Sequence, residues 1–269
     1  MSFCDFHLHT TFSDGKKVIH EVFDICTHAD VQFISITDHD DIRSASIIPK
    51  EIQTVSGIEL SSHYGNAEIH LLGYGYDVDN IQLTQAIERI RVERQARMIR
   101  MLTRAVHLKF LPDIDFSQEI HSDKVPGRSA MADLLIRHGA AKSRDEVFSR
   151  FLGERKVLYE PVFTLDVFEA LDILLQAGCI TSFAHPQRSN KDEIIKKLVS
   201  RGLHALEAYY PFHDEKITHY YLNLAAKYSM MVTGGSDYHS GVYAFSCQED
   251  NLESFIGHVR DRIDLRSRK

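Results

Sequence analysis

The chain of 269 residues has little of what marks several classes of protein. It contains no tryptophan, six prolines and fourteen glycines. This composition leaves no room for a long low-complexity linker, so the whole length is expected to fold. The four cysteines are far apart in the sequence and form no CxxC pair. We interpret them as small buried apolar residues in a reducing compartment rather than as a disulfide framework.

Long apolar runs and an excess of positive charge are also absent. No stretch approaches the ~20 apolar residues of a membrane span, and the first residues lack a basic region followed by an apolar run. A cytoplasmic protein without a membrane partner is therefore expected. The formal net charge of -7 provides no global basic field for gripping duplex nucleic acid. A nucleotide-sized partner is compatible with this charge, and the oligomeric state is open.

Histidine, in contrast, is abundant. It accounts for 16 of the 269 residues, whereas the hydrophobic share of 43% and the charged share of 26% are those of an ordinary globular protein. Histidine is often recruited as a base or as a metal ligand. The excess therefore predicts a functional site that is rich in imidazole.

Three segments with different patterns follow one another along the chain. Residues 1–78 alternate short apolar runs with helical pattern, residues 79–160 are helical in pattern, and residues 161–269 return to the alternation. The outer segments are expected to be halves of one α/β barrel, and the middle segment an inserted helical domain that covers the site and selects the substrate. The strands predicted for the barrel are Phe3–His9, Gln32–Thr37, Gln53–Leu60, Glu68–Tyr74, Ile180–Ala184, Ala205–Tyr210 and Met230–Thr233.

The first predicted strand carries the sharpest local signal. A period of two places His7 and His9 on one face, while Phe6 and Leu8 lie on the other. Two imidazoles that point at one spot have chelating geometry. The alternative is a pair of hydrogen-bonded histidines at a strand end. Asp14 follows in a Ser-Asp-Gly sequence, which alone would be an ordinary turn.

Polar residues also stand at the next predicted strands. His39 lies in an acidic loop after an apolar strand, where parallel α/β folds keep their ligands, although its neighbours Asp38 and Asp40 could equally cap the next helix. Glu59 ends the third strand and has a surface carboxylate as its alternative interpretation. His70 lies within an apolar run, where an unpaired ring would be costly, so the alternative is a hydrogen-bonded core histidine.

The last two motifs lie beyond the predicted insertion. His185 and Pro186 terminate a strand, since proline ends ladder pairing where the imidazole emerges. Asp237 and His239 follow a Gly-Gly turn and lie two residues apart, so they can face one centre or two adjacent ones. Taken together, the motifs place a metal-type ligand at the same end of different predicted strands, and coincidence becomes a poor account.

In the order HxH, SDG, TDHD, GIE-S, EIH, AHP and GSD-x-H, these motifs resemble the polymerase and histidinol phosphatase (PHP) family of phosphoesterases over nearly the whole chain. The EIHLLGY segment before a helical insertion is similar to the branch of nucleoside 3',5'-bisphosphate phosphatases and short-RNA 5'-exonucleases. The resemblance implies a distorted (β/α)7 TIM-like barrel. It also implies a metal-dependent hydrolase acting on a phosphomonoester of a nucleoside bisphosphate, AMP or the 5' end of a short RNA.

The resemblance implies the metal ligands as well. One ion would be held by His7, His9, Glu59 and Asp237. Glu59 would bridge to a second ion held by His70 and His185. The third ion would be held by Asp14, His39 and His239. A carboxylate at position 14 is what the nucleotide-acting branch usually has.

Mixed imidazole and carboxylate ligands suit Mn, Fe or Zn better than Mg. We expect two to three divalent ions, with manganese as the first choice, that activate a water for attack on the phosphate. The residues expected to take part in catalysis are His7, His9, Glu59, Asp237 and His239.

Substrate contacts are predicted from residue type and position. Arg128 and Arg188 are candidates for bidentate phosphate clamps, and the resemblance favours Arg128. The alternative for both is a solvated surface arginine. Tyr209 and His213, near the end of the strand that begins at Ala205, are further candidates.

Three other functions remain open at this point. Histidinol-phosphate phosphatase would differ in a ligand of the third metal. The second is amide hydrolysis on an amidohydrolase barrel. The sequence of that fold also begins with an HxH motif, but it usually has a bridging lysine, whereas here Glu59 is the natural bridge. A non-catalytic metal-binding accessory domain would be favoured by lost ligands, yet all nine positions are filled.

Overall fold

The computed structural model describes residues 2–47, 49, 51–117, 128–161, 163–245 and 247–266. The chain divides into two compact units, one formed by Met1–Ile87 with Thr164–Lys269 and the other by Glu88–Phe163. The sequence predicts an inserted helical domain at residues 79–160, and the second unit covers residues 88–163. The four cysteines are buried and none is in a disulfide.

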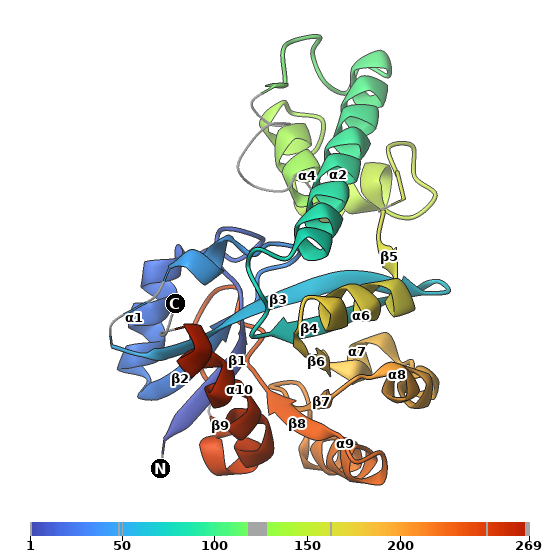
Figure 1. Cartoon of the computed structure of the whole chain (residues 1–269). Helices are drawn as coiled ribbons and strands as arrows, with labels where there is room; N and C mark the ends of the chain where they lie inside the picture. Colours follow the sequence, from blue (N-terminus) through green and yellow to red (C-terminus); the bar gives the residue numbers. More distant parts are fainter. Residues whose placement is uncertain are drawn as a thin grey trace. The chain divides into compact units, whose positions relative to one another are not determined.

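The first unit is built on one sheet with the strand order β8-β7-β6-β4-β3-β2-β1-β9, and β5 pairs with β3 outside this order (Figure 1). Its strands are β1 (Phe3–Leu8), β2 (Val31–Ile36), β3 (Gln53–Tyr64), β4 (Ala67–Tyr74), β5 (Leu165–Asp166), β6 (Ile180–Phe183), β7 (Ala205–Tyr209), β8 (Met231–Gly234) and β9 (Cys247–Gln248).

The sheet nearly closes on itself, through contacts between β1 and the segment that follows β8. Leu8 and Tyr238 form a parallel bridge. The backbone N–H of Asp237 donates to the carbonyl of His7 at 2.9 Å. Gly235 allows this approach, because a Cβ there would lie 2.2 Å from the Cβ of His7. The predicted α/β barrel-like fold is confirmed.

One strand runs against the others of the predicted set. β4 is antiparallel to both β3 and β6, and β3 continues past the predicted end at Leu60 to Tyr64. Gly65, with a φ of +59°, forms the turn between them with Asn66, and such two-residue turns typically join hairpins. The prediction that Glu59 ends its strand is therefore wrong, since it lies within β3, whereas His70, predicted within an apolar run, lies within the antiparallel strand β4.

Helices surround this sheet (Figure 1). Phe6, on the even face of β1, packs edge-on against Phe33 of β2 at 4.9 Å and Phe255 of α10 at 5.0 Å between ring centroids. The even face of β1 therefore packs in the apolar core, and its odd residues are free to build the site. The helices are α1 (Ile19–His28), α6 (Val167–Gln176), α7 (Pro186–Ser189), α8 (Ile195–Arg201), α9 (Glu215–Lys227) and α10 (Glu253–Arg266).

The second unit is helical. Its elements are the greater part of α2 (Ile81–His107), α4 (Arg128–Arg137), α5 (Arg144–Val147) and a π-helical turn, Phe148–Leu152. They share an apolar core that includes Met98, Leu135 and Phe151. Arg100 and Arg104 pair with Glu160, so this part of α2 presents ion pairs beside its apolar stripe.

Among the described residues, no helix combines the length and the apolar character that crossing a bilayer requires.

Candidate metal centre

Strand β1 delivers the first two imidazoles. His7 and His9 are fully buried, together with Asp5 on the same face of the strand. The Asp5 carboxylate accepts hydrogen bonds from the backbone N–H of His7 at 3.0 Å and of Ser236 at 2.9 Å. It also accepts one from the Tyr243 hydroxyl at 2.8 Å. Asp5 thus ties β1 to the segment that carries Asp237.

Glu59 lies at the centre of the site, and its side chain is 0% exposed. One oxygen, Oε1, lies 2.8 Å from Nδ1 of His70 and 3.0 Å from Nε2 of His185. The other oxygen, Oε2, faces a different set of imidazole nitrogens at 3.1–3.2 Å, from His7, His9 and His39. The two oxygens of one carboxylate therefore serve two groups of ligands, as a bridge between two ions requires.

The chemistry of this donor set fits metal ions. Nε2 of His7 and Nε2 of His9 each lie 3.1 Å from Oε2 of Glu59, and all three atoms are buried without a hydrogen-bond partner. Buried polar atoms are rarely left in this state, because each would cost the free energy of its lost hydration. A cation bound by their lone pairs would satisfy all three at once.

The described residues form three groups in which the ligand atoms lie within 4.8 Å of one another. The first group is the set predicted for the first metal. The second contains Glu59 and His70 with His39, while the predicted His185 reaches the same oxygen of Glu59 as His70 does. The third adds His9 to the three predicted residues. These groups are His7, His9, Glu59 and Asp237; His39, Glu59 and His70; and His9, Asp14, His39 and His239.

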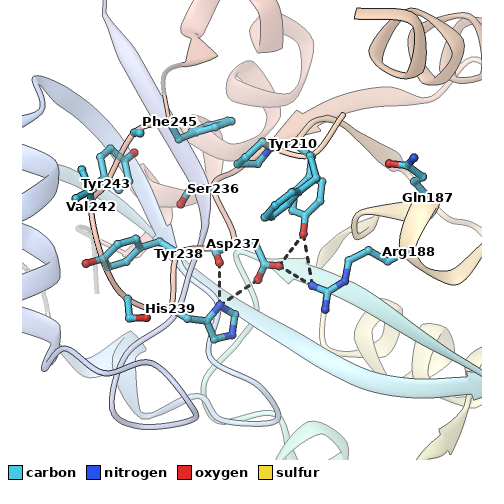
Figure 2. Close-up of a pocket in the computed structure, with 14 residues that line it drawn as sticks. Gln187, Arg188, Tyr210, Ser236, Asp237, Tyr238, His239, Val242, Tyr243 and Phe245 are labelled. Carbon is cyan, nitrogen blue, oxygen red and sulfur yellow. Dashed lines mark hydrogen bonds and ion pairs between the residues drawn. The ribbon is translucent and has the colours of Figure 1, made fainter. Parts of the chain in front are cut away.

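Asp237 divides its two oxygens in the same way. Oδ1 lies 3.1 Å from Nε2 of His9 and 3.5 Å from Nδ1 of His239. Oδ2 accepts hydrogen bonds from Nη1 of Arg188 at 2.8 Å and from the Tyr210 hydroxyl at 3.1 Å, and Figure 2 shows these two side chains meeting at the carboxylate. Asp237 also adopts a φ of +52°, in the left-handed region that few non-glycine residues occupy and that Asp tolerates better than most.

Asp14 forms the open end of the site. Its side chain is 60% exposed and lies on the loop after β1. Oδ1 is 3.0 Å from Nε2 of His239, whereas Nδ1 of His9 and Nε2 of His39 are both 4.0 Å from the carboxylate. The loop is anchored by buried Asp38, which accepts hydrogen bonds from the backbone and hydroxyl of Thr10 and from the hydroxyl of Ser13.

The crowding of charges shifts the pKa values of the site. Burial lowers the pKa of His9 and of His70, but neighbouring carboxylates outweigh burial and raise the two values to about 9 and about 10. Burial also disfavours the charged form of Glu59, but the surrounding imidazoles outweigh it and hold its pKa well below the usual value. Burial lowers the pKa of His39 to about 4, which keeps its nitrogen lone pair available at neutral pH.

Sequence reasoning missed the residues that support the ligands. Nδ1 of His7 lies 2.9 Å from Glu207, which also accepts the backbone N–H of His185 at 2.7 Å. This contact leaves Nε2 of His7 to face the centre. Glu207 is a carboxylate within the apolar strand β7, a signal that could have been recognised. Asp38 and Asp40, weighed as helix caps, instead hold loops: Asp40 accepts the backbone N–H of Ser61 at 2.8 Å.

The four predicted substrate contacts lie in different surroundings. Arg188 borders the site through Asp237. Tyr209 packs against the apolar core instead, and its neighbour Tyr210 faces the imidazoles, 5.5 Å from the His185 ring. His213 is buried, with Nδ1 at the Ala208 carbonyl. Arg128 belongs to the second unit, where its guanidinium lies 5.9 Å from the Phe148 ring centroid, and the preceding residues 125–127 lie outside the described part.

Comparison with known proteins finds relatives along most of the chain, although no family model matches. The phosphoribosyl 1,2-cyclic phosphate 1,2-diphosphodiesterase of Eggerthella lenta is 24% identical over 253 residues, covering 87% of this chain and 93% of the relative. The 5'-3' exoribonuclease Rnm of Escherichia coli is 25% identical over 205 residues, covering 73% and 70%. The 3',5'-nucleoside bisphosphate phosphatase of Chromobacterium violaceum is 24% identical over 251 residues, covering 89% and 88%.

These relatives are hydrolases of phosphate esters, and two of them carry the activities of the branch that the motifs resemble. The predicted resemblance to this group of phosphoesterases and the predicted hydrolase class are confirmed.

Solved structures agree on the fold. A proposed metal-dependent phosphoesterase from Bifidobacterium adolescentis superposes with a TM-score of 0.76 at 24% identity, covering 96% of each chain. A Chromobacterium violaceum protein described as an amidohydrolase, with bound sulfate and no metal, gives a TM-score of 0.75 at 21% identity, covering 93% of this chain and 96% of that one. At this identity the likeness concerns the fold alone.

Proposed function

We propose that this chain is a metal-dependent phosphatase that removes a phosphate from a nucleotide-type substrate: a nucleoside 3',5'-bisphosphate, AMP or the 5' end of a short RNA. The observation that carries the proposal is the Glu59 carboxylate, whose two oxygens face separate groups of buried imidazoles. The relatives that cover most of the chain support it, since all three act on phosphate esters.

We assign the ligands as the resemblance implies. His7, His9, Glu59 and Asp237 would hold one ion, and Glu59 with His70 and His185 a second. Asp14, His39 and His239 would hold a third. Manganese is the first choice and iron or zinc the alternatives, because these ions accept mixed nitrogen and oxygen ligands. When bound, such ions polarise the phosphate oxygens and lower the pKa of a bound water towards neutrality.

The remaining roles fall to the protein itself. Glu207 fixes the ring orientation of His7 and the backbone at His185, and Asp5 holds the segment of Asp237 against β1. Arg188 brings a guanidinium to the edge of the site, where it would contact a phosphate oxygen while Nη1 stays with Asp237. Its charge also offsets the several carboxylates that an anionic substrate would otherwise meet.

The test is phosphate release by the manganese-loaded protein from 3',5'-bisphosphoadenosine, AMP, histidinol phosphate and a short 5'-phosphorylated RNA. Glu59→Ala removes the central carboxylate, and Glu215→Ala on the exposed surface of α9 is the matched control. We expect release that prefers a nucleotide or the RNA, disappears in Glu59→Ala and persists in the control. Preference for histidinol phosphate would overturn the substrate class, and absence of Glu59-dependent release would leave a non-catalytic metal-binding role.

A phosphodiesterase activity is a second candidate. It is favoured by the relative from Eggerthella lenta, whose length is covered to 93% and whose name gives a cyclic phosphate as substrate. Adding a ribose 1,2-cyclic phosphate to the substrates separates the two: a diesterase opens the ring before any inorganic phosphate appears.

A further inference from the structure

A cavity of about 860 Å³ adjoins the candidate metal centre in the first unit. Its lining comes from α7 and from the loops after β7 and β8, and Asp237 and His239 belong to both the cavity and the metal-ligand groups. Figure 2 shows Val242 on the far side of the cavity from Tyr210, with Asp237 between them. The volume lies in the range of small-molecule sites. A phosphate held at the ligands would therefore leave the rest of its molecule at this cavity.

The cavity has exposed apolar side chains on its walls. Phe212 is 75% exposed and Val242 is 92% exposed, and both line the cavity. Exposed aromatic and aliphatic side chains that gather beside a polar centre mark a binding surface more often than single scattered ones do. The surface therefore suits an apolar or aromatic group attached to the phosphate.

The Phe212 ring packs against Tyr210, which is itself hydrogen-bonded. Its ring lies 5.4 Å from the ring of Tyr210, and the Tyr210 hydroxyl donates to Asp237 and lies 3.4 Å from Nη1 of Arg188. The pair of rings formed by Phe212 and Tyr210 is thus connected, by one hydrogen bond, to the predicted metal ligand Asp237. A planar ring that stacks on Phe212 would be held at a defined distance from the phosphate.

We propose that this cavity is a base-binding subsite, in which Phe212 stacks on the nucleobase of the substrate and Val242 contacts it from the opposite wall. The inference rests on the proposed function and adds the part of the substrate that the metal ligands cannot distinguish. A nucleobase fits better than an aliphatic substituent, because the exposed π-face of phenylalanine accepts any base and such stacking is tolerant of sequence.

The test compares two esters with the same sugar and phosphate, AMP and ribose 5-phosphate, in wild type, Phe212→Ala and Phe212→Trp. Loss of one base–aromatic contact should lower the ratio of kcat/KM for AMP to that for ribose 5-phosphate about five- to a hundredfold in Phe212→Ala. Phe212→Trp should restore the ratio. Tyr220→Ala, an exposed aromatic outside the cavity, should leave it unchanged.

An equal loss for both esters, or an unchanged ratio in Phe212→Ala, would overturn the base subsite and leave the aromatic wall to another occupant, such as a protein partner. Calorimetry with adenosine, which has no phosphate, separates this outcome from failure of the proposed function. Binding of adenosine by wild type and its loss in Phe212→Ala would support the subsite even in a protein that hydrolyses neither ester. No binding of adenosine by wild type would overturn it.

Discussion

The two ends of the histidine–carboxylate cluster are held in different ways. Glu59 lies in a paired strand, fully buried, with five imidazole nitrogens at 2.8–3.2 Å. Asp14 lies on a loop, 60% exposed, with three imidazole nitrogens at 3.0–4.0 Å. The sheet fixes the closed end before any ligand arrives, whereas the open end can adjust. We therefore expect an ion at the Asp14 end to bind more weakly and to exchange first.

The largest effect should come from breaking the closed end. Glu59→Gln keeps the shape but removes the charge that five imidazoles face, so turnover should fall by about 10³-fold or more, at the upper end for one lost electrostatic contact. Metal content by elemental analysis should fall by about two ions, since one bridge serves two groups. Full metal content in a folded Glu59→Gln protein would contradict the bridging role.

The next largest effect should come from Glu207, which supports His7 at the closed end. Glu207→Gln retains a hydrogen-bonding group for Nδ1 of His7 but loses the negative charge, so metal affinity should fall by about 10–100-fold, as for other outer partners of ligating histidines. Competition with a metal-sensing dye measures this change. Glu215→Gln serves as the surface control, and equal affinities in the two variants would remove Glu207 from the site.

The open end should give a smaller effect. Asp14→Ala should release about one ion and lower turnover by about tenfold, the lower end of what such a loss costs, while the ions of the closed end stay bound. Titration with a mild chelator checks the order: wild type should lose this ion first. Simultaneous loss of all ions in Asp14→Ala would show that the two ends do not differ as their burial suggests.

The smallest effect is the dependence of the metal-free protein on pH. His9 and His70 have pKa values raised to about 9 and about 10. Their charged forms therefore stabilise the fold fully below about pH 6.5, the unfolded value, and this contribution is lost as pH rises through about 9–10. The Tm of the metal-free protein should fall over that window, and saturating metal should remove the fall, because bound imidazoles carry no proton to lose. A Tm that stays level across the window would contradict the raised values.

Strand-borne residues were the most predictable part of the site. His7 and His9 share a face because side chains alternate along any strand, and this needs no knowledge of the partners. The direction of β4 was not predictable from ligand spacing alone, although Gly65 and Asn66 gave a hairpin signal between two apolar runs. His70 therefore reaches Glu59 from a neighbouring strand that runs the opposite way.

Supporting residues were less predictable, because their roles depend on distant contacts. Glu207 acts on His7 across 200 positions of sequence, and nothing near either residue indicates the pairing. Tyr209 and Tyr210 differ by one position, and the exact end of the strand decides which of the two faces the imidazoles. A periodic pattern in the sequence does not locate the end of a strand to within one residue, so it cannot decide between Tyr209 and Tyr210.

The contact between Gly235 and His7, where the sheet closes, forms late during synthesis of the chain. His7, His9, His39, Glu59 and His70 leave the ribosome early, whereas the segment that closes the sheet comes more than two hundred residues after His7. Contacts so distant in sequence form late, since a long loop must close before they contribute. A nascent chain thus carries a histidine-rich half-site for much of its translation, and only completion of the barrel brings Asp237 to it.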